Sequence, residues 1–174
     1  MEKNNRNYEW LLEKYVSYFF IYSFIGWILE VIVVLFLEKR LVNRGFLMMP
    51  ILPIYGFGAV LISIIFKNEN YYWVNIALIG GFIATSLELV SSYILKDIFN
   101  LKLWDYSKMR YNFQGRISLI TSLFFMIGSV LIVKILNPIF ERKIRRYKYN
   151  VWFDFLLSVI CIITFLDFVS TIVK

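Results

Sequence analysis

Four acidic residues interrupt long apolar stretches of this chain, namely Glu30, Glu88, Asp154 and Asp167. An ionised side chain at the depth of a bilayer costs about 2.5–3.5 kcal/mol, so each acid needs a partner or a cavity. Glu30, Glu88 and Asp167 stand six or seven residues before the end of their apolar runs. That spacing predicts one common depth, roughly 10 Å below one membrane surface. Asp154 lies near the start of its run and is expected at the opposite surface.

Small and hydroxylated residues share a helical face with these three acids. The three sets are Ser23, Gly26 and Glu30; Ala77, Gly81, Thr85, Glu88 and Ser92; and Thr164, Asp167 and Thr171. Residues three or four apart lie on one side of a helix. Small residues let helices approach closely, and hydroxyl groups bond between helices. The pattern fits either a functional polar site or acids that only hold neighbouring helices together.

Polar partners follow or precede the acidic ends of these runs. Arg44 stands in an Asn43-Arg44-Gly45 turn, and Arg116 follows the turn that starts at Asn112. Arginine is suited to bidentate recognition of carboxylate or phosphate. The loop over residues 96–116 also carries Trp104 and Asp105, which fit either a lid over a site or an aromatic anchor at the interface.

The second apolar run begins with the sequence PILPIYGFG, residues 50–58, which includes Tyr55. Proline lacks the backbone donor of a helix, and glycine lowers helix preference. The run is therefore expected to be kinked or partly unwound near Pro50–Gly58. Irregular backbone at membrane depth is tolerated where it lines a cavity, and the start of a half-helix presents a positive dipole end.

Several kinds of chemistry are excluded by what the sequence lacks. There is no histidine, and the single cysteine, Cys161, lies inside an apolar run. Ser-His-Asp catalysis, histidine zinc sites and intrachain disulfides are therefore excluded. No GxxxxGK[ST] motif is present, so ATP hydrolysis would need a separate subunit. No cofactor and no metal site are expected, and catalysis is not favoured.

Composition places the chain in the membrane. Of its 174 residues, 60% are hydrophobic and 18% are charged, and the mean hydropathy is +0.67. Soluble domains average about 45–50% apolar and about 25% charged residues. The net charge of +7 is therefore read as membrane topology and not as affinity for nucleic acid.

Five apolar runs of 21 to 25 residues are long enough to cross a bilayer. They are Tyr15–Leu37, Phe46–Phe66, Tyr71–Leu95, Ile117–Ile139 and Val151–Val173. The predicted fold is all-α, a polytopic membrane protein forming one transmembrane domain over residues 1–174. Residues 1–14 are expected to lie at the interface as a short amphipathic helix, and residues 140–150 to form a basic linker.

Five crossings place the N-terminus and the basic linker on one side of the membrane. Lysine and arginine are equally numerous on the two sides, nine on each. The segment Arg142–Lys148, with five basic residues in seven, resembles a topological anchor. A cytoplasmic N-terminus in the cytoplasmic membrane is therefore predicted.

A weak internal repeat relates two parts of the chain. Residues 24–32 read FIGWILEVI and residues 82–90 read FIATSLELV, with Leu-Glu at the same place 58 residues later. Each copy is followed by a polar turn and another apolar run. This indicates a duplicated two-helix hairpin with a fifth helix added, although chance similarity is the alternative.

The blocks FIGWILEV, NRGFLMMPILPIYGFG, LWDYS and NFQGRISL, with the late Asp167, resemble the putative ABC-transporter type IV (permease-like) family of small bacterial multi-pass membrane proteins. The resemblance implies a permease-like protein. The motif residues that it implies are Glu30, Asn43, Arg44, Gly45, Pro53, Tyr55, Gly56, Trp104, Asp105, Asn112, Gly115 and Asp167.

The predicted function is a transport component with an intramembrane acidic site. Its candidate substrate-binding residues are Glu30, Glu88, Asp167, Asn43, Arg44, Arg116, Tyr55, Trp104, Asp105 and Asn112. The expected partners are the lipid bilayer, a separate ATPase subunit and a second copy of the chain. The alternatives are a membrane enzyme or binder acting on an anionic lipid head group, with a glutamate as base, and an accessory subunit of a membrane complex.

Overall fold

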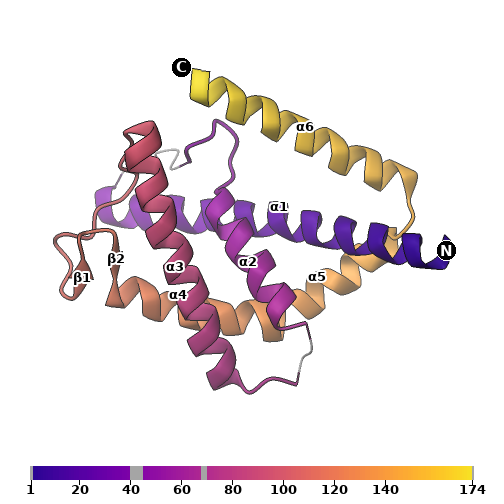
Figure 1. Ribbon diagram of the computed structural model, residues 1–174, viewed down its shortest axis with the longest axis horizontal. Coiled ribbons are helices and arrows are strands. Elements are labelled where there is room, and N and C mark those ends of the chain that lie inside the picture. Colours follow the sequence, from indigo (N-terminus) through magenta and orange to yellow (C-terminus); the bar gives the residue numbers. More distant parts are fainter. Residues whose placement is uncertain (1, 40–44, 68–69, 174) are drawn as a thin grey trace. The chain divides into compact units, whose positions relative to one another are not determined.

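The computed structural model describes residues 2–39, 45–67 and 70–173, and within these ranges it is almost entirely helical (Figure 1). The α-helices are α1 (Glu2–Glu38), α2 (Pro53–Ile65), α3 (Trp73–Phe99), α4 (Leu119–Leu131), α5 (Asn137–Ile144) and α6 (Val151–Val173). A π-helical turn (Ile132–Leu136) joins α4 to α5, and a 3-10 turn (Arg145–Tyr147) follows α5. A short hairpin of β1 (Asn112–Phe113) and β2 (Ile117–Ser118) precedes α4. The all-α prediction is confirmed.

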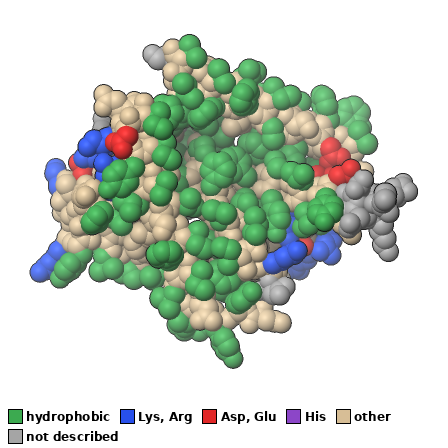
Figure 2. All heavy atoms as spheres, in the orientation of Figure 1, with side chains coloured by type: hydrophobic (Ala, Val, Ile, Leu, Met, Phe, Trp, Pro, Cys, Tyr) green, Lys and Arg blue, Asp and Glu red, His purple; other side chains and the backbone are tan. Residues whose placement is uncertain are grey.

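Within the described ranges, four helical stretches are long and apolar enough to cross a membrane. They are Asn7–Phe36, Trp73–Phe99, Leu119–Tyr147 and Val151–Val173. Hydrophobic side chains cover much of the face seen in Figure 2, and none of the residues of α6 is fully buried. Exposed apolar surface of this extent is typical of helices that face lipid. The chain is a membrane protein.

The second predicted run, Phe46–Phe66, is not one continuous helix. Residues 45–52 are irregular and α2 has 13 residues, about 20 Å, which is short of the roughly 30 Å bilayer core. The predicted interruption is confirmed, but it ends at Pro53. Proline disfavours helix in the preceding residue and is well tolerated at the first helical position, so Pro53 starts the helix. Gly56 and Gly58 then lie inside regular helix.

Two other predicted boundaries differ from the observed ones. The segment 1–14 is not a separate helix, because α1 continues without a break from Glu2 to Glu38. The basic segment 140–150 is also helical over most of its length, through α5 and the 3-10 turn. The start of α4 is set by a cap. Ser118 exchanges reciprocal hydrogen bonds with Thr121, which fixes the first helical residue at Leu119.

The chain divides into two compact units, a first unit of Met1–Gly56 with Ile139–Lys174 and a second unit of Phe57–Pro138. In the first unit, α1 and α6 run in the same direction (Figure 1). Near their starts, Lys148 lies over the Trp10 ring, and Lys14 forms a 2.7 Å ion pair with Glu141 of α5. Further along, the irregular segment contacts both helices, since Leu52 N–H donates to the Ser23 carbonyl of α1 and Met49 N–H donates to Asp167 of α6.

In the second unit, α3 and α4 form an antiparallel pair. Gly80 contacts Ser129, and Gly81 contacts Met126. Thr85 Oγ1 donates to Ser122 Oγ at 3.0 Å. Residue numbers rise along α3 as they fall along α4, which fixes the antiparallel direction. The core beside this pair consists of Ile62, Phe66, Ile76 and Val133.

Candidate functional site

Glu30 of α1 is held by a tyrosine from α2. Tyr55 Oη donates to Glu30 Oε1 at 2.7 Å. The ring can lie against α1 only because Gly26, one turn before Glu30, has no side chain, and a Cβ there would collide with Tyr55. The next residue of α2, Gly56, packs in the same way against Phe19. The small residues on the face of Glu30 therefore bring the tyrosine within reach of the carboxylate.

Glu88 of α3 has the same kind of partner in the second unit. Tyr106 Oη, from the loop after α3, donates to Glu88 Oε1 at 2.9 Å. Glu88 is buried, with 4% of its surface exposed. The tyrosine is fixed in turn by its backbone, because Tyr106 N–H donates to the Gly115 carbonyl at 2.8 Å. Glu30 and Glu88 are thus each bonded to a phenol from outside their own helix.

Asp105 shapes the loop that carries Tyr106. Its Oδ2 accepts from Lys102 Nζ at 2.6 Å and its Oδ1 from Ser107 N–H at 2.9 Å. These hydrogen bonds, that from Lys102 first, lower the pKa of Asp105 to about 2. Gly115 packs against this carboxylate, and a Cβ there would lie 2.8 Å from Asp105 Oδ1. Its φ of +68° is also one that favours glycine. Asp105 is exposed, and its hydrogen bonds fix the conformation of the loop.

Asn112 and Trp104 lock the second half of the same loop. Asn112 Oδ1 accepts from Gly115 N–H at 2.8 Å, and its Nδ2 donates to the Met109 carbonyl at 2.7 Å. Residues 114 and 115 both have positive φ, and Arg116 N–H donates to Phe113 O, as in a type I′ turn. Trp104 Nε1 donates to the Arg116 carbonyl at 2.9 Å. The predicted turn at 112–115 is confirmed.

Arg116 lies against the last turns of α3. Its Nη1 donates to both the carbonyl and the hydroxyl of Ser92, each at 3.0 Å. Its guanidinium lies over the Tyr93 ring, 3.9 Å from the centroid. In the part of the chain that the structure describes, Arg116 forms no ion pair.

Asp167 of α6 bonds to backbone in the first unit. Its carboxylate accepts from the N–H groups of Met48 at 3.2 Å and Met49 at 2.8 Å. Backbone donors in an irregular segment at membrane depth need acceptors, because lipid offers none. Asp167 therefore supplies the acceptors for two backbone N–H groups of residues 45–52. Asn43 and Arg44, predicted beside this segment, lie outside the described residues.

The predicted site residues fall into two groups. Glu30, Tyr55 and Asp167 belong to the first unit. The second unit holds a larger set, Glu88, Trp104, Asp105, Asn112 and Arg116. Convergence of all three acids remains a prediction. Among the described residues no group of three or more acidic, histidine or cysteine side chains is placed to hold a metal ion.

Sequence reasoning missed Tyr106 as a site residue, although the block LWDYS was singled out. The predicted repeat gave no signal for it, because Tyr106 lies 18 residues after Glu88, whereas Tyr55 lies 25 residues after Glu30. Ser92 was placed on the face of Glu88, but its pairing with Arg116 depends on how the loop folds back on α3.

A family model described as putative ABC-transporter type IV matches residues 17–172. The chain belongs to this family. No curated protein and no solved structure matches it. The match extends over both glutamate–tyrosine pairs and the whole loop between α3 and α4. Membership in the putative ABC-transporter type IV family, together with the long apolar helices, fits a transport-related membrane protein.

Proposed function

We propose that this chain is the membrane-spanning component of a transporter and that each of its two glutamate–tyrosine pairs takes part in transport. The observation that carries the proposal is the equivalence of the pairs, Tyr55 with Glu30 at 2.7 Å and Tyr106 with Glu88 at 2.9 Å. Both acids occupy the same place in the predicted internal repeat. Acidic residues within transmembrane segments mark substrate, ion and proton pathways.

A glutamate bonded to a phenol can exchange that partner for a transported group. The carboxylate loses solvation at membrane depth, and the tyrosine hydroxyl compensates for part of this loss. A substrate cation, hydroxyl group or proton that reaches Glu30 or Glu88 replaces the phenol as its partner. The chemistry of the pair therefore favours cationic or hydroxylated substrates, or proton coupling.

The directions of the helices support a fifth crossing through α2. In the first unit α1 and α6 run the same way, so an odd number of crossings must lie between them. In the second unit α3 and α4 are antiparallel and account for two. The segment between α1 and α3 supplies the third, with residues 45–52 irregular and α2 helical. We thus retain the predicted duplicated hairpin, α1 with α2 and α3 with α4, followed by α6.

Energy for transport must come from another chain, because the sequence has no GxxxxGK[ST] motif. Family membership makes a separate ATPase the expected partner. Five crossings are few for a complete permease, so two copies of the chain are proposed in the complex. The complex is placed in the bacterial cytoplasmic membrane with the N-terminus in the cytoplasm.

The test uses the affinity-tagged chain expressed at its natural level and purified from its own membranes in a mild detergent. We expect a co-purifying subunit and vanadate-sensitive ATP hydrolysis. Glu30→Gln and Glu88→Gln keep the side-chain shape and remove the charge, so folding and subunit binding should persist while ATP hydrolysis loses its regulation by the membrane component. A chain that purifies alone, without ATP hydrolysis, would contradict the ATP-driven proposal.

A further inference from the structure

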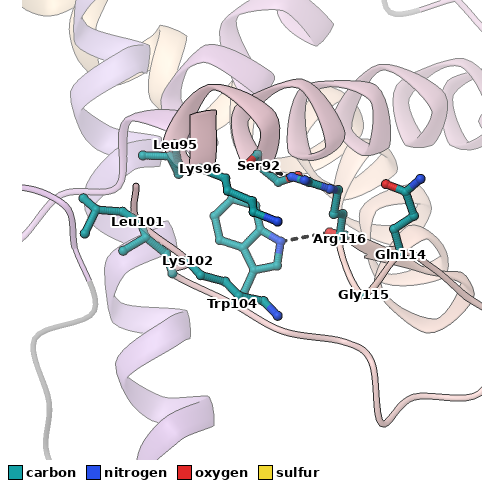
Figure 3. Close-up of a pocket in the computed structure, with 10 residues that line it drawn as sticks. Ser92, Leu95, Lys96, Leu101, Lys102, Trp104, Gln114, Gly115 and Arg116 are labelled. Carbon is teal, nitrogen blue, oxygen red and sulfur yellow. Dashed lines mark hydrogen bonds between the residues drawn. The ribbon is translucent and has the colours of Figure 1, made fainter. Parts of the chain in front are cut away.

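A small open pocket, with a volume of about 60 Å³, lies in the second unit, between the last turns of α3 and the loop that follows. Its polar lining includes Lys96, Lys102 and Arg116. Figure 3 shows the Trp104 ring in the middle of the group, with Lys96 above it and Lys102 below it in this view. Three cationic side chains and one indole therefore surround the same space.

Among the residues that the structure describes, only one of the three cations has an acidic partner. Lys102 is paired with Asp105 at 2.6 Å. Within the described ranges, neither Lys96 nor Arg116 forms an ion pair. Nη1 of Arg116 donates to Ser92, and no hydrogen bond joins its other N–H groups to a residue that the structure describes. Two positive charges on one pocket repel each other, and a bound anion would relieve that repulsion.

Structural roles do not account for Lys96. A lysine in the last turn of a helix often caps the free carbonyl groups. Here the backbone itself caps one of these carbonyl groups, because the N–H groups of both Asn100 and Leu101 donate to the Leu95 carbonyl. Lys96 is exposed at the pocket, and no hydrogen bond joins it to any other described residue.

The chemistry of the lining selects a phosphate group. Arginine recognises phosphate through paired N–H donors, and lysine adds a point charge. The loop joins two candidate membrane spans, Trp73–Phe99 and Leu119–Tyr147, so it lies at the level of the lipid head groups. Tryptophan is enriched at this level, where its ring contacts the acyl boundary and its N–H faces polar groups.

We propose that this pocket binds a phosphate group, carried by an anionic phospholipid of the adjoining leaflet or by a soluble phosphate compound. Arg116 and Lys96 contact the phosphate oxygens, and Trp104 packs beside the group. Asp105 stays bonded to Lys102 and Ser107, so its negative charge is compensated by these donors and repels the phosphate less. The pocket is separate from the glutamate–tyrosine pairs, so the inference does not depend on the proposed transport function.

The experiment measures lipid binding to the full chain by native mass spectrometry in detergent. Phosphatidylglycerol and phosphatidylcholine with identical acyl chains are titrated against the wild type, Lys96→Gln/Arg116→Gln and a control, Lys108→Gln/Arg110→Gln. The control removes two charges from the same loop at residues that do not line the pocket. We expect the pocket variant to bind phosphatidylglycerol about tenfold more weakly, whereas the control should stay within about twofold of the wild type.

A second arm separates the two phosphate sources. Inorganic phosphate is added at constant ionic strength while tryptophan fluorescence is recorded, and Trp104→Phe identifies the signal of Trp104. A phosphate-dependent change that the pocket variant loses supports a soluble phosphate compound, and its absence together with lipid selectivity supports the phospholipid.

Folding is controlled with the single variant Lys96→Gln. Lys96 makes no hydrogen bond within the described part of the chain, so this variant should unfold at the same temperature as the wild type and still bind phosphatidylglycerol more weakly. The proposal is overturned if the pocket variant and the control bind both lipids alike and neither variant alters the response to phosphate.

Discussion

Glu30 and Glu88 each accept a hydrogen bond from a tyrosine that lies outside their own helix. Serine and threonine often bond back to their own helix, as Ser63 does to the Ala59 carbonyl. A tyrosine hydroxyl lies at the end of a rigid ring and reaches across from another element. This arrangement holds the carboxylate while leaving its partner replaceable, which suits a site better than a permanent link.

The contribution of the Tyr106 hydroxyl can be measured directly. Tyr106→Phe removes one donor to a buried carboxylate, and we expect a loss of about 0.6–1.7 kcal/mol in unfolding free energy, the range found between membrane helices. Tyr93→Phe is the matched control, because its hydroxyl bonds Gln114 in an exposed position. Thermal unfolding in detergent compares the two, and combination with Glu88→Gln should give less than additive losses. Equal losses from Tyr106→Phe and Tyr93→Phe would contradict this interpretation of the pair.

Asp105 should make the loop depend on pH only in strong acid. Its pKa falls from 3.8 to about 2 in the folded chain, so its stabilising effect is complete above pH 3.8 and is lost as the pH falls through 2. Asp105→Asn should therefore lower the unfolding temperature by a constant amount between pH 5 and 8, with the difference shrinking near pH 2–3. Asp97→Asn, also on an exposed residue, is the charge control. A difference that vanishes already at pH 5 would refute the lowered pKa.

Among the elements, α2 depends most closely on a single contact surface. It starts at Pro53 and at once packs on α1, where Gly56 meets Phe19 and Ser23. Any side chain at this position would push α2 away from α1 and carry Tyr55 with it. The sequence places glycine there because the backbones approach too closely for a Cβ.

Gly56→Ala and Gly58→Ala test this surface within one helix. A Cβ on Gly56 would collide with α1, and overpacking of this kind costs about 1–3 kcal/mol. A Cβ on Gly58 would meet only Leu87 Cδ1 at 3.7 Å, an ordinary contact. Gly58→Ala should therefore be neutral or stabilising, by up to about 1 kcal/mol through helix preference. Unfolding temperatures in detergent provide the measurement, and equal effects would show that α2 does not need the close approach.

For the whole molecule, the decisive property is the number of membrane crossings. Cysteine labelling in a Cys161→Ser background should mark Ser107→Cys from outside intact cells, and Lys143→Cys and Lys67→Cys only after the membrane is opened. Lys67 follows α2, so the side of the membrane on which it is labelled shows whether the segment 45–66 crosses the membrane. Labelling of Lys67→Cys from outside would remove the fifth crossing, and labelling of Lys143→Cys from outside would reverse the orientation.

Much of the architecture follows from local properties of the sequence. The length of an apolar run is local, so four of the five predicted spans reappear as long apolar helices. The break before Pro53 and the turn at Asn112–Gly115 are also local, because proline and glycine restrict or release the backbone wherever they stand. The faces that carry small residues beside the acids follow from helical spacing and were predicted correctly, since Gly26 and Gly81 both lie in helix contacts.

The partners of the acids were decided by tertiary structure. Glu88 is bonded by Tyr106 from the following loop, and Asp167 accepts from Met48 and Met49, more than one hundred residues earlier in the chain. A carboxylate accepts equally well from a phenol, an arginine or a backbone N–H group. Its sequence neighbourhood shows that a partner is needed, and only the packing of helices and loops brings one donor within 3 Å.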